Sequence, residues 1–150
     1  MCIRDRVMNK LTKIVKPKKI FMGEKDFQQL YLVKKELGKK YKTKVIPCKT
    51  IRDRNKVALS TRNLFLNKSN LIIAAKIYEK LVSIKKYIKN KKNIPIFLKL
   101  KKKELKNNYK IKIDYLELRN IKNLKLSNTK NNSRLFIAYY LNNVRLIDNL

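Results

Sequence analysis

The sequence predicts an α/β fold in which a parallel α/β part is followed by a small α+β unit with antiparallel strands. Over residues 7–47, helical patterns alternate with short apolar runs in the order helix, strand, helix, strand, which is typical of a parallel sheet. Beyond residue 67, a long helical pattern precedes alternating segments and an Asn-Asn pair typical of a hairpin. With 150 residues, 44% of them apolar, the chain suffices for one ordinary domain or two small ones.

The first helix is predicted over residues 7–16 and ends before Pro17. Its apolar positions recur at helical spacing and predict a buried face: Val7, Met8, Leu11, Ile14 and Val15.

A strand, a second helix and a second strand follow. Residues 19–22 predict a short buried strand that ends at Gly23. The next helix is predicted over residues 26–37, with Gly38 at the position where a left-handed residue closes a helix. Its apolar face consists of Phe27, Leu30, Val33 and Leu37. Residues 44–47 predict the second strand.

The second part begins with an irregular polar segment over residues 48–67 and a long helix over residues 69–90. The predicted apolar stripe of that helix is Leu71, Ala74, Ala75, Tyr78, Leu81, Val82 and Ile88. A short lysine-rich helix is expected after Pro95, to about Asn107.

A strand over residues 111–119 and a closing hairpin complete the predicted elements. In the strand, Leu116 and Leu118 fall out of step with the alternation that precedes them. The hairpin joins residues 135–141 to residues 144–147 through a two-residue Asn-Asn turn of positive φ. We expect no internal repeat.

The charge of the chain admits two interpretations. Lys and Arg number 40 and Asp and Glu number 10, a formal net charge of +30. Clustered Lys and Arg bind phosphates, so a basic nucleic-acid-binding module is an alternative function. Solvated faces are favoured instead, because Lys, Asn and Ile are abundant together and lysine is spread along the whole chain.

Composition also excludes several function classes. The chain has no His, so its own residues cannot provide imidazole base catalysis or a His-ligated metal site. Two glycines are too few for a glycine-rich phosphate loop, and Cys2 and Cys48 have no metal-ligand spacing. Apolar runs such as residues 71–75 fall far short of the ~20 residues of a membrane span, and no signal core follows the first residues. We therefore expect a cytoplasmic protein.

Residues 23–29, Gly-Glu-Lys-Asp-Phe-Gln-Gln, carry groups suited to an anionic ligand. They follow a predicted strand and open a predicted helix, where N–H groups face the ligand crevice of an open sheet. Lys25 offers a mobile charge for phosphate, and Gln29 lies one helical turn beyond it. The structural alternative is that Asp26 caps the helix and Gly23 makes a turn.

Residues 59–63, Leu-Ser-Thr-Arg-Asn, are the second such segment. Two hydroxyls followed by Arg62 can donate to phosphate oxygens from several sides. The alternative is the capped start of a helix with an incidental arginine. Ile51, ahead of this segment, is suited to packing on a ligand ring or to ordinary core packing.

Together these residues resemble the pantoate–beta-alanine ligase family. The run from residue 18 to residue 30 resembles the family's aromatic-Gly-Glu-Lys-Asp-aromatic-Gln-Gln-Leu segment, and residues 58–63 resemble its Leu-Ser-Ser-Arg-Asn loop. Residues 145–149 match its terminal Arg-Leu-Ile-Asp-Asn, and order and spacing agree over residues 7–150.

The resemblance implies a domain organisation. Residues 7–66 would be the last part of a Rossmann-like nucleotidyl-transferase domain that binds ATP and pantoate, and residues 67–150 a C-terminal α+β lid domain. Residues 1–6 do not resemble the family and are expected to be a leader foreign to it. In the family the protein is a homodimer.

The resemblance also implies the activity, an ATP-dependent condensation of pantoate with beta-alanine to pantothenate through a pantoyl adenylate. ATP is a substrate, and Mg²⁺ is implied, but its ligands and a His-x-Gly-His motif belong to the N-terminal half of the family, which this sequence does not match. We therefore expect this chain to be a fragment that is inactive alone, with no membrane and no specific nucleic acid among its partners.

Site residues follow from the same resemblance. The residues expected to bind ATP are Gly23, Glu24, Lys25, Asp26, Ile51, Leu59, Ser60, Thr61 and Arg62. Lys25 and Arg62 are expected to be catalytic and Gln29 to hold pantoate, and no metal ligand is expected. The sequence departs from the family in two places: Asn55-Lys56 stands where it has Asp-Gly, and Thr61 replaces a serine.

Overall fold

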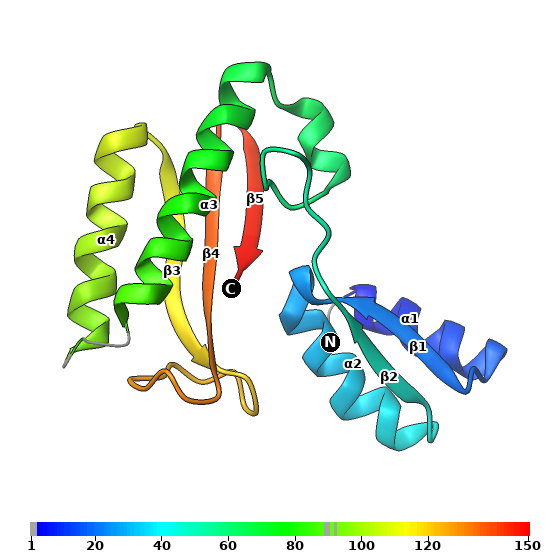
Figure 1. Cartoon of the computed structure of the whole chain (residues 1–150). Coiled ribbons are helices and arrows are strands. Elements are labelled where there is room, and N and C mark those ends of the chain that lie inside the picture. Colours follow the sequence, from blue (N-terminus) through cyan, green and yellow to red (C-terminus); the bar gives the residue numbers. More distant parts are fainter. Residues whose placement is uncertain (1–2, 89–90, 92) are drawn as a thin grey trace. The chain divides into compact units, whose positions relative to one another are not determined.

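The computed structural model describes residues 3–88, 91 and 93–150 (Figure 1). The chain divides into two compact units, Met1–Thr50 and Ile51–Leu150. The structure thus divides the chain between residues 50 and 51, whereas the predicted domain boundary lies between residues 66 and 67. The segment between the two positions packs with the second unit, because Val57 and Leu66 belong to that unit's core.

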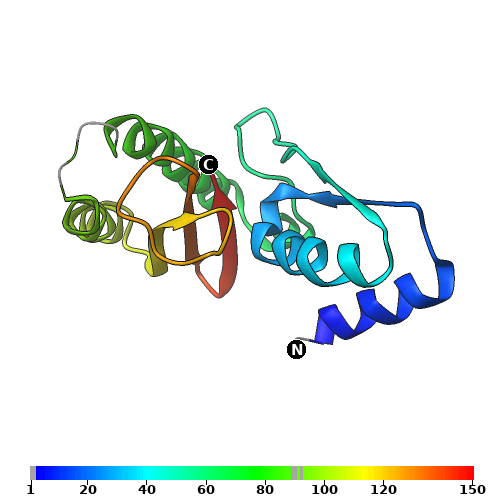
Figure 2. The same cartoon turned by 90° about the horizontal axis from the view of Figure 1, so that it is seen from below.

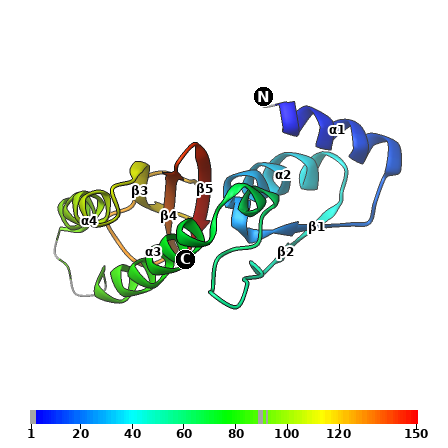
Figure 3. The same cartoon turned by 90° about the horizontal axis from the view of Figure 1, so that it is seen from above.

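The first unit has the predicted order helix, strand, helix, strand. Its elements are α1 (Ile3–Val15), β1 (Lys19–Gly23), the 3-10 helix η1 (Glu24–Asp26), α2 (Phe27–Lys40) and β2 (Lys44–Cys48). The strands pair in parallel, with Lys19 opposite Lys44. Helix α2 lies between α1 and the strand pair (Figures 2 and 3). The α/β prediction for this part is confirmed.

Helix α2 provides most of the core of the first unit. Its predicted apolar face is the buried one, and the core consists of Leu30, Val33 and Leu37 with Val45 of β2. Phe27, from the same predicted face, packs against this core while staying partly exposed.

The predicted end of α2 at Gly38 is wrong. The helix continues to Lys40, and Lys42, not Gly38, adopts a positive φ, of 51°. A Cβ on Gly38 would lie 3.4 Å from the carbonyl oxygen of Thr43. The missing side chain therefore allows the chain to return closely past the helix after it ends.

Helix α1 buries a different face from the predicted one. Met8 packs on the core of the first unit and Thr12 is buried, its Oγ1 donating to the carbonyl of Met8 at 2.7 Å. The other four predicted positions are 50–76% exposed: Val7, Leu11, Ile14 and Val15. An apolar stripe of α1 thus has no covering element among the described residues of this unit.

The second unit packs two helices on an antiparallel sheet. Its elements are the 3-10 helix η2 (Thr61–Phe65), α3 (Lys68–Ile88), α4 (Ile94–Tyr109), β3 (Lys112–Asn120), β4 (Ser133–Leu141) and β5 (Val144–Asn149). The strand order is β3-β4-β5, and α3 and α4 cover one face of the sheet (Figures 1 and 3). The predicted α+β unit is confirmed; residues 89 and 90, the predicted end of the long helix, lie outside the described residues.

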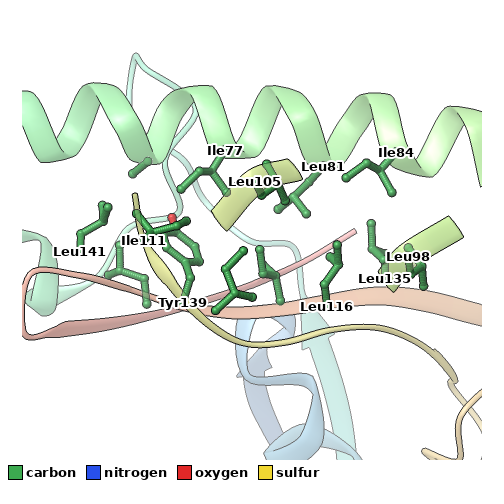
Figure 4. Close-up of a cluster of buried hydrophobic side chains, with 14 of the residues drawn as sticks. Ile77, Leu81, Ile84, Leu98, Leu105, Ile111, Leu116, Leu135, Tyr139 and Leu141 are labelled. Atoms are coloured by element: carbon green, nitrogen blue, oxygen red, sulfur yellow. The ribbon is translucent and has the colours of Figure 1, made fainter. Parts of the chain in front are cut away.

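The core of the second unit lies between α3 and the sheet (Figure 4). The buried positions of α3 are spaced alternately four and three residues apart: Asn70, Ala74, Ile77, Leu81, Ile84 and Ile88. The predicted stripe contained Ala74, Leu81 and Ile88 but missed Ile77 and Ile84, and its Val82 is 44% exposed. The predicted stripe therefore overlaps the buried face of α3 but is centred to one side of it.

Strand β3 contains an irregularity that explains its broken alternation. Its pairing with β4 shifts between Ile113 and Tyr115, as at a β-bulge. Ile113 is buried before the shift, and Leu116 and Leu118 are buried after it, so the out-of-step leucines are core residues. The predicted hairpin between β4 and β5 is present, and Asn142 in its turn has a φ of 52°.

Candidate functional site

The first candidate segment, residues 23–29, lies where β1 ends and α2 begins. Gly23 ends β1 opposite Cys48 of β2, so the carboxyl ends of both strands meet at this edge. Open parallel sheets bind their ligands at that edge, and the N-terminus of α2 adds the positive end of a helix dipole. Lys25 and Gln29 are both half-buried here. The structure thus places this segment at the edge where open parallel sheets bind their ligands.

The structural alternatives for Gly23 and Asp26 are not supported. Gly23 has φ −67° and ψ 135°, extended backbone that any residue adopts, and a Cβ there would meet no atom within 4 Å. Asp26 holds the N-cap position of α2, but its side chain makes no capping hydrogen bond. The backbone at position 23 therefore does not require a glycine, and the space over Gly23 is open.

The second candidate segment belongs to the second unit and begins as a small hairpin. Arg52 and Ala58 form a β-bridge, and the N–H of Leu59 donates to the carbonyl of Ile51 at 3.0 Å. Ile51 and Leu59 are 72% and 53% exposed, so ordinary core packing does not account for Ile51. An exposed apolar pair at the ends of the hairpin is the arrangement that a flat ligand ring would cover.

Residues 60–63 continue this segment with polar groups. The Ser60 hydroxyl accepts from the N–H of Arg62 at 3.3 Å, so Ser60 caps η2 as the structural alternative expected. Thr61 and Arg62 are exposed, and Nη1 of Arg62 donates to the carbonyl of Arg145 in β5 at 3.1 Å. Asn63 Nδ2 donates to the carbonyl of Ala58 at 3.1 Å and holds the segment onto the hairpin.

Lys56 occupies a backbone conformation that favours glycine. Its φ is 66°, in the left-handed region, at the position where the family resemblance has glycine. Its N–H donates to the carbonyl of Asp53 at 2.9 Å, so the tight turn forms despite the side chain. The hairpin therefore stores backbone strain at this position.

Lys56→Gly is expected to stabilise the second unit by about 1 kcal/mol, because relief of the left-handed strain exceeds the entropy that glycine adds to the unfolded chain. Urea unfolding followed by circular dichroism would measure this. Arg54→Gly, in the same turn but without a positive φ, is the matched control and should destabilise slightly. Equal destabilisation by both changes would show that Lys56 carries no strain.

Two residues to which the sequence assigned no role are joined in the structure. Arg52 and Asp148 form a bidentate ion pair at 2.7 and 2.9 Å between the hairpin and β5. Burial lowers the pKa of Arg52, but the hydrogen bond and the charge of Asp148 outweigh it, so this pKa is raised. The signal in the sequence was an acid, Asp148, within the family's terminal motif, in a chain with only 10 acidic residues.

Tyr139 of β4 lies close enough to this pair for both charges to affect its pKa. Burial raises its pKa, the charge of Asp148 raises it further, and the charge of Arg52 opposes the shift. The folded state therefore binds the phenol proton more tightly than the unfolded chain, whose tyrosines titrate near about pH 10. The stability that depends on the neutral phenol is fully present below that pH and is lost as the pH rises beyond it.

The free energy of unfolding is accordingly expected to fall above about pH 10. Tyr139→Phe should make this fall shallower, because no proton is then lost from the buried ring. Urea midpoints between about pH 9 and 11.5 would measure it. Tyr87→Phe, at a position 56% exposed on α3, is the control and should leave the slope unchanged. Identical slopes for Tyr139→Phe and the unmodified chain would refute the assignment.

A surface depression beside α4 is lined by four lysines: Lys102, Lys106, Lys110 and Lys112. Its other lining residues are Asn107, Ile111 and Ile113, so it offers no aromatic ring on which a base could stack. None of the predicted site residues lines it. This depression therefore gives little support to the alternative of a nucleic-acid-binding module.

Neither a metal cluster nor a membrane span is found in the described part of the chain. Within those residues, no three Cys, Asp or Glu side chains gather where they could hold a metal ion. In the same residues, no helix combines the length and the apolar character needed to cross a bilayer.

Comparison with known proteins gives one consistent set of relatives. A family model described as pantoate-beta-alanine ligase matches residues 5–150, so the match includes the last two residues of the predicted leader, 5 and 6. The pantothenate synthetase of Flavobacterium psychrophilum is 36% identical over 148 residues, which cover 96% of this chain and 52% of that protein. The pantothenate synthetase of Vesicomyosocius okutanii is 35% identical, with 97% and 51% covered.

Solved structures agree with the sequence relatives. Pantothenate synthetase from Thermus thermophilus has a TM-score of 0.83 at 27% identity, covering 96% of this chain and 53% of that one. Pantoate-beta-alanine ligase from Francisella tularensis, complexed with beta-gamma ATP and beta-alanine, has a TM-score of 0.67 at 34% identity, with 96% and 47% covered. The chain spans about half the length of the curated relatives it matches.

Proposed function

The chain belongs to the pantoate–beta-alanine ligase family and matches the C-terminal half of its members, and on that premise we propose that it supplies half of the active site of an enzyme that joins pantoate to beta-alanine with ATP. The observation that carries this proposal is the Gly-Glu-Lys-Asp segment at the carboxyl end of β1, with open space over Gly23.

The proposed reaction has two steps. A pantoate carboxylate oxygen attacks the α-phosphorus of ATP, and the bond to the bridging oxygen of the β-phosphate breaks, so pyrophosphate leaves with the electron pair. The amine nitrogen of beta-alanine then attacks the acyl carbon of the pantoyl adenylate, loses a proton, and displaces AMP. Both steps concentrate negative charge on phosphate oxygens, so fixed positive charge and N–H donors are what the protein must provide.

The first unit would provide Lys25 and the start of α2 to the phosphates. An ammonium on a flexible stem suits phosphate as a point charge, and the start of α2 adds the positive end of a helix dipole. Glu24 and Asp26 would border ATP beside it. Gln29, one turn along α2 and half-buried, offers both an acceptor and donors to the hydroxyl and carboxylate groups of pantoate.

The second unit would provide the hairpin and η2. Ile51 and Leu59, the exposed apolar pair, are suited to the adenine ring. Ser60 and Thr61 offer hydroxyls to the phosphates. Arg62 carries five N–H donors, and its bond to the Arg145 carbonyl uses only part of that fork, so the guanidinium is also suited to a phosphoryl oxygen.

Mg²⁺, which often accompanies ATP, is usually held by one or two carboxylates together with substrate phosphates, and the described residues contain no group of three Cys, Asp or Glu side chains that could hold it by themselves. The proposal therefore assigns it no ligand and no step here. We place the reaction in the cytoplasm and keep the homodimer of the family as a prediction.

The rest of the active site would come from the half of the family that this chain does not match. Two separate parts of the first unit leave apolar side chains uncovered and available to such a partner: the exposed stripe of α1, and Phe21 of β1, which is 65% exposed. Parallel sheets are ordinarily covered on both faces, whereas this one is a pair of strands with α2 on one side.

The proposal is tested by reconstitution. The 150-residue chain would be mixed with the half of the Flavobacterium psychrophilum relative that it does not span, and pantothenate and AMP would be measured with ATP, pantoate and beta-alanine present. Equal formation of both products by the mixture, and none by either half alone, is the expected result. A mixture that associates but forms neither product would contradict the proposal.

A further inference from the structure

We propose that Arg52 and Asp148 are positioning residues that anchor the ATP-facing segment, residues 51–63, to the sheet of the second unit. The inference rests on the proposed function for the role of that segment. The anchoring itself rests on the contacts of the two side chains and can be tested separately.

Arg52 contacts three different elements through one guanidinium. Nη1 and Nη2 donate to the two carboxylate oxygens of Asp148 in β5. Nη1 also donates to the carbonyl of Lys56 at 3.2 Å, across the hairpin. The guanidinium carbon lies 4.0 Å from the centre of the Tyr78 ring on α3. One side chain therefore links the hairpin to β5 and to α3.

Asp148 is itself held firmly. Its Oδ1 accepts the N–H of Asn149 at 2.8 Å, and its backbone pairs with Ile137 of the central strand β4. The side chains of Arg52 and Asp148 are only 17% and 10% exposed, so water screens this pair far less than it screens a surface pair. The carboxylate is thus a fixed point of the sheet.

A second contact ties the other end of the same segment to β5. Arg62 donates one hydrogen bond to the Arg145 carbonyl, and Arg62 is exposed. The two ties differ in kind, because the Arg62 bond is single and exposed whereas the Arg52 pair is bidentate and largely buried. The Arg52 pair therefore holds the hairpin end of the segment, together with the buried Val57, independently of the Arg62 bond at the other end.

The geometry requires arginine specifically. A lysine at position 52 would keep the charge but lose the fork that meets both carboxylate oxygens, and it would lose the flat face that lies on Tyr78. Arg52→Lys therefore removes the anchoring contacts while keeping the positive charge, so its effect reports on the contacts alone.

The first experiment measures amide hydrogen exchange in the 150-residue chain. Val57, Leu59 and Asn63 are the reporters, because their N–H groups bond within the segment. Arg52→Lys and Asp148→Asn should each speed exchange at these amides by about 10- to 100-fold, and the double variant should be little faster than either single one. Exchange in the centre of β4 should be unchanged.

Glu104→Gln is the matched control, because Glu104 pairs with Lys101 on the surface of α4, and it should not alter the reporters. Unchanged reporters in Arg52→Lys, or a uniform increase that includes β4, would overturn the anchoring. If Asp148→Asn fails to fold, Asp148→Glu keeps the charge and displaces the carboxylate by one methylene, and the same comparison decides.

The second experiment measures kinetics in the reconstituted enzyme. Arg52→Lys should raise the KM for ATP about tenfold and leave the KM for pantoate unchanged, because Gln29 lies in the other unit. A fall in kcat with both KM values unchanged would mean a merely structural role and would overturn the positioning role. If unmodified reconstituted enzyme makes no product, the proposed function fails, whereas hydrogen exchange still decides the anchoring.

Discussion

Lys25→Ala is expected to slow pantoate-dependent release of pyrophosphate in the reconstituted enzyme by roughly 10²- to 10³-fold, the usual cost of removing one group that stabilises transition-state charge. Lys25 is half-buried and follows the carboxyl end of β1, two residues after Gly23, over which the space is open. Charge on the leaving pyrophosphate grows as the reaction proceeds, so the loss should fall on kcat more than on the KM for ATP.

Lys34→Ala is the matched control for this change. Lys34 is exposed on α2, so the variant removes the same charge from the same unit without touching the proposed site. Its rate should equal that of the unmodified enzyme. Equal rates for both variants would remove Lys25 from the site, and equal losses would mean that only overall charge matters.

Ile77→Ala is expected to destabilise the second unit by about 2–5 kcal/mol, the range for truncating a fully buried aliphatic side chain. Ile77 is 0% exposed and points from α3 toward the sheet (Figure 4). For a unit of this size the loss should lower the melting temperature by at least about 8 °C. Differential scanning calorimetry of the 150-residue chain measures it.

Ile72→Ala on the same helix provides the comparison. Ile72 is 55% exposed, so the same chemical truncation creates no cavity and should lower the melting temperature only slightly. Equal effects at the two positions would mean that α3 does not pack through the face described above.

Local patterns were sufficient to predict the elements but not every buried face. The periodicity of α2 predicted its core residues correctly because one helix covers one strand pair. The stripe of α1 was read correctly as apolar, but which part of it is buried depends on neighbours that the pattern cannot show. In β3, a bulge shifted the alternation, and only the pairing with β4 reveals it.

Within the candidate site, the sequence predicted the two segments but not what holds one of them. Gly23 to Gln29 form a local strand–turn–helix, so their proximity follows from the chain itself. Arg52 and Asp148 lie 96 residues apart, and their pairing depends on how α3 and β5 pack. The assignment of the site residues to ATP and pantoate stays a prediction until it is measured.

Lysine also occupies several backbone positions with a positive φ, a conformation that favours glycine. Seven non-glycine residues in the described part of the chain have a positive φ, and four are lysines: Lys16, Lys42, Lys56 and Lys110. Both glycines have ordinary φ values. Lysine thus occupies backbone positions where glycine would be less strained, which supports compositional bias over a dedicated polyanion surface as the source of the charge.

Pantoate-dependent exchange of labelled pyrophosphate into ATP, without beta-alanine, tests the central claim most directly, because it requires formation of the pantoyl adenylate and nothing after it. The reconstituted mixture should show exchange that depends on pantoate, and the 150-residue chain alone should show none. Exchange by the chain alone, or a well-associated mixture with no exchange, would contradict the claim that this chain is half of an adenylate-forming ligase.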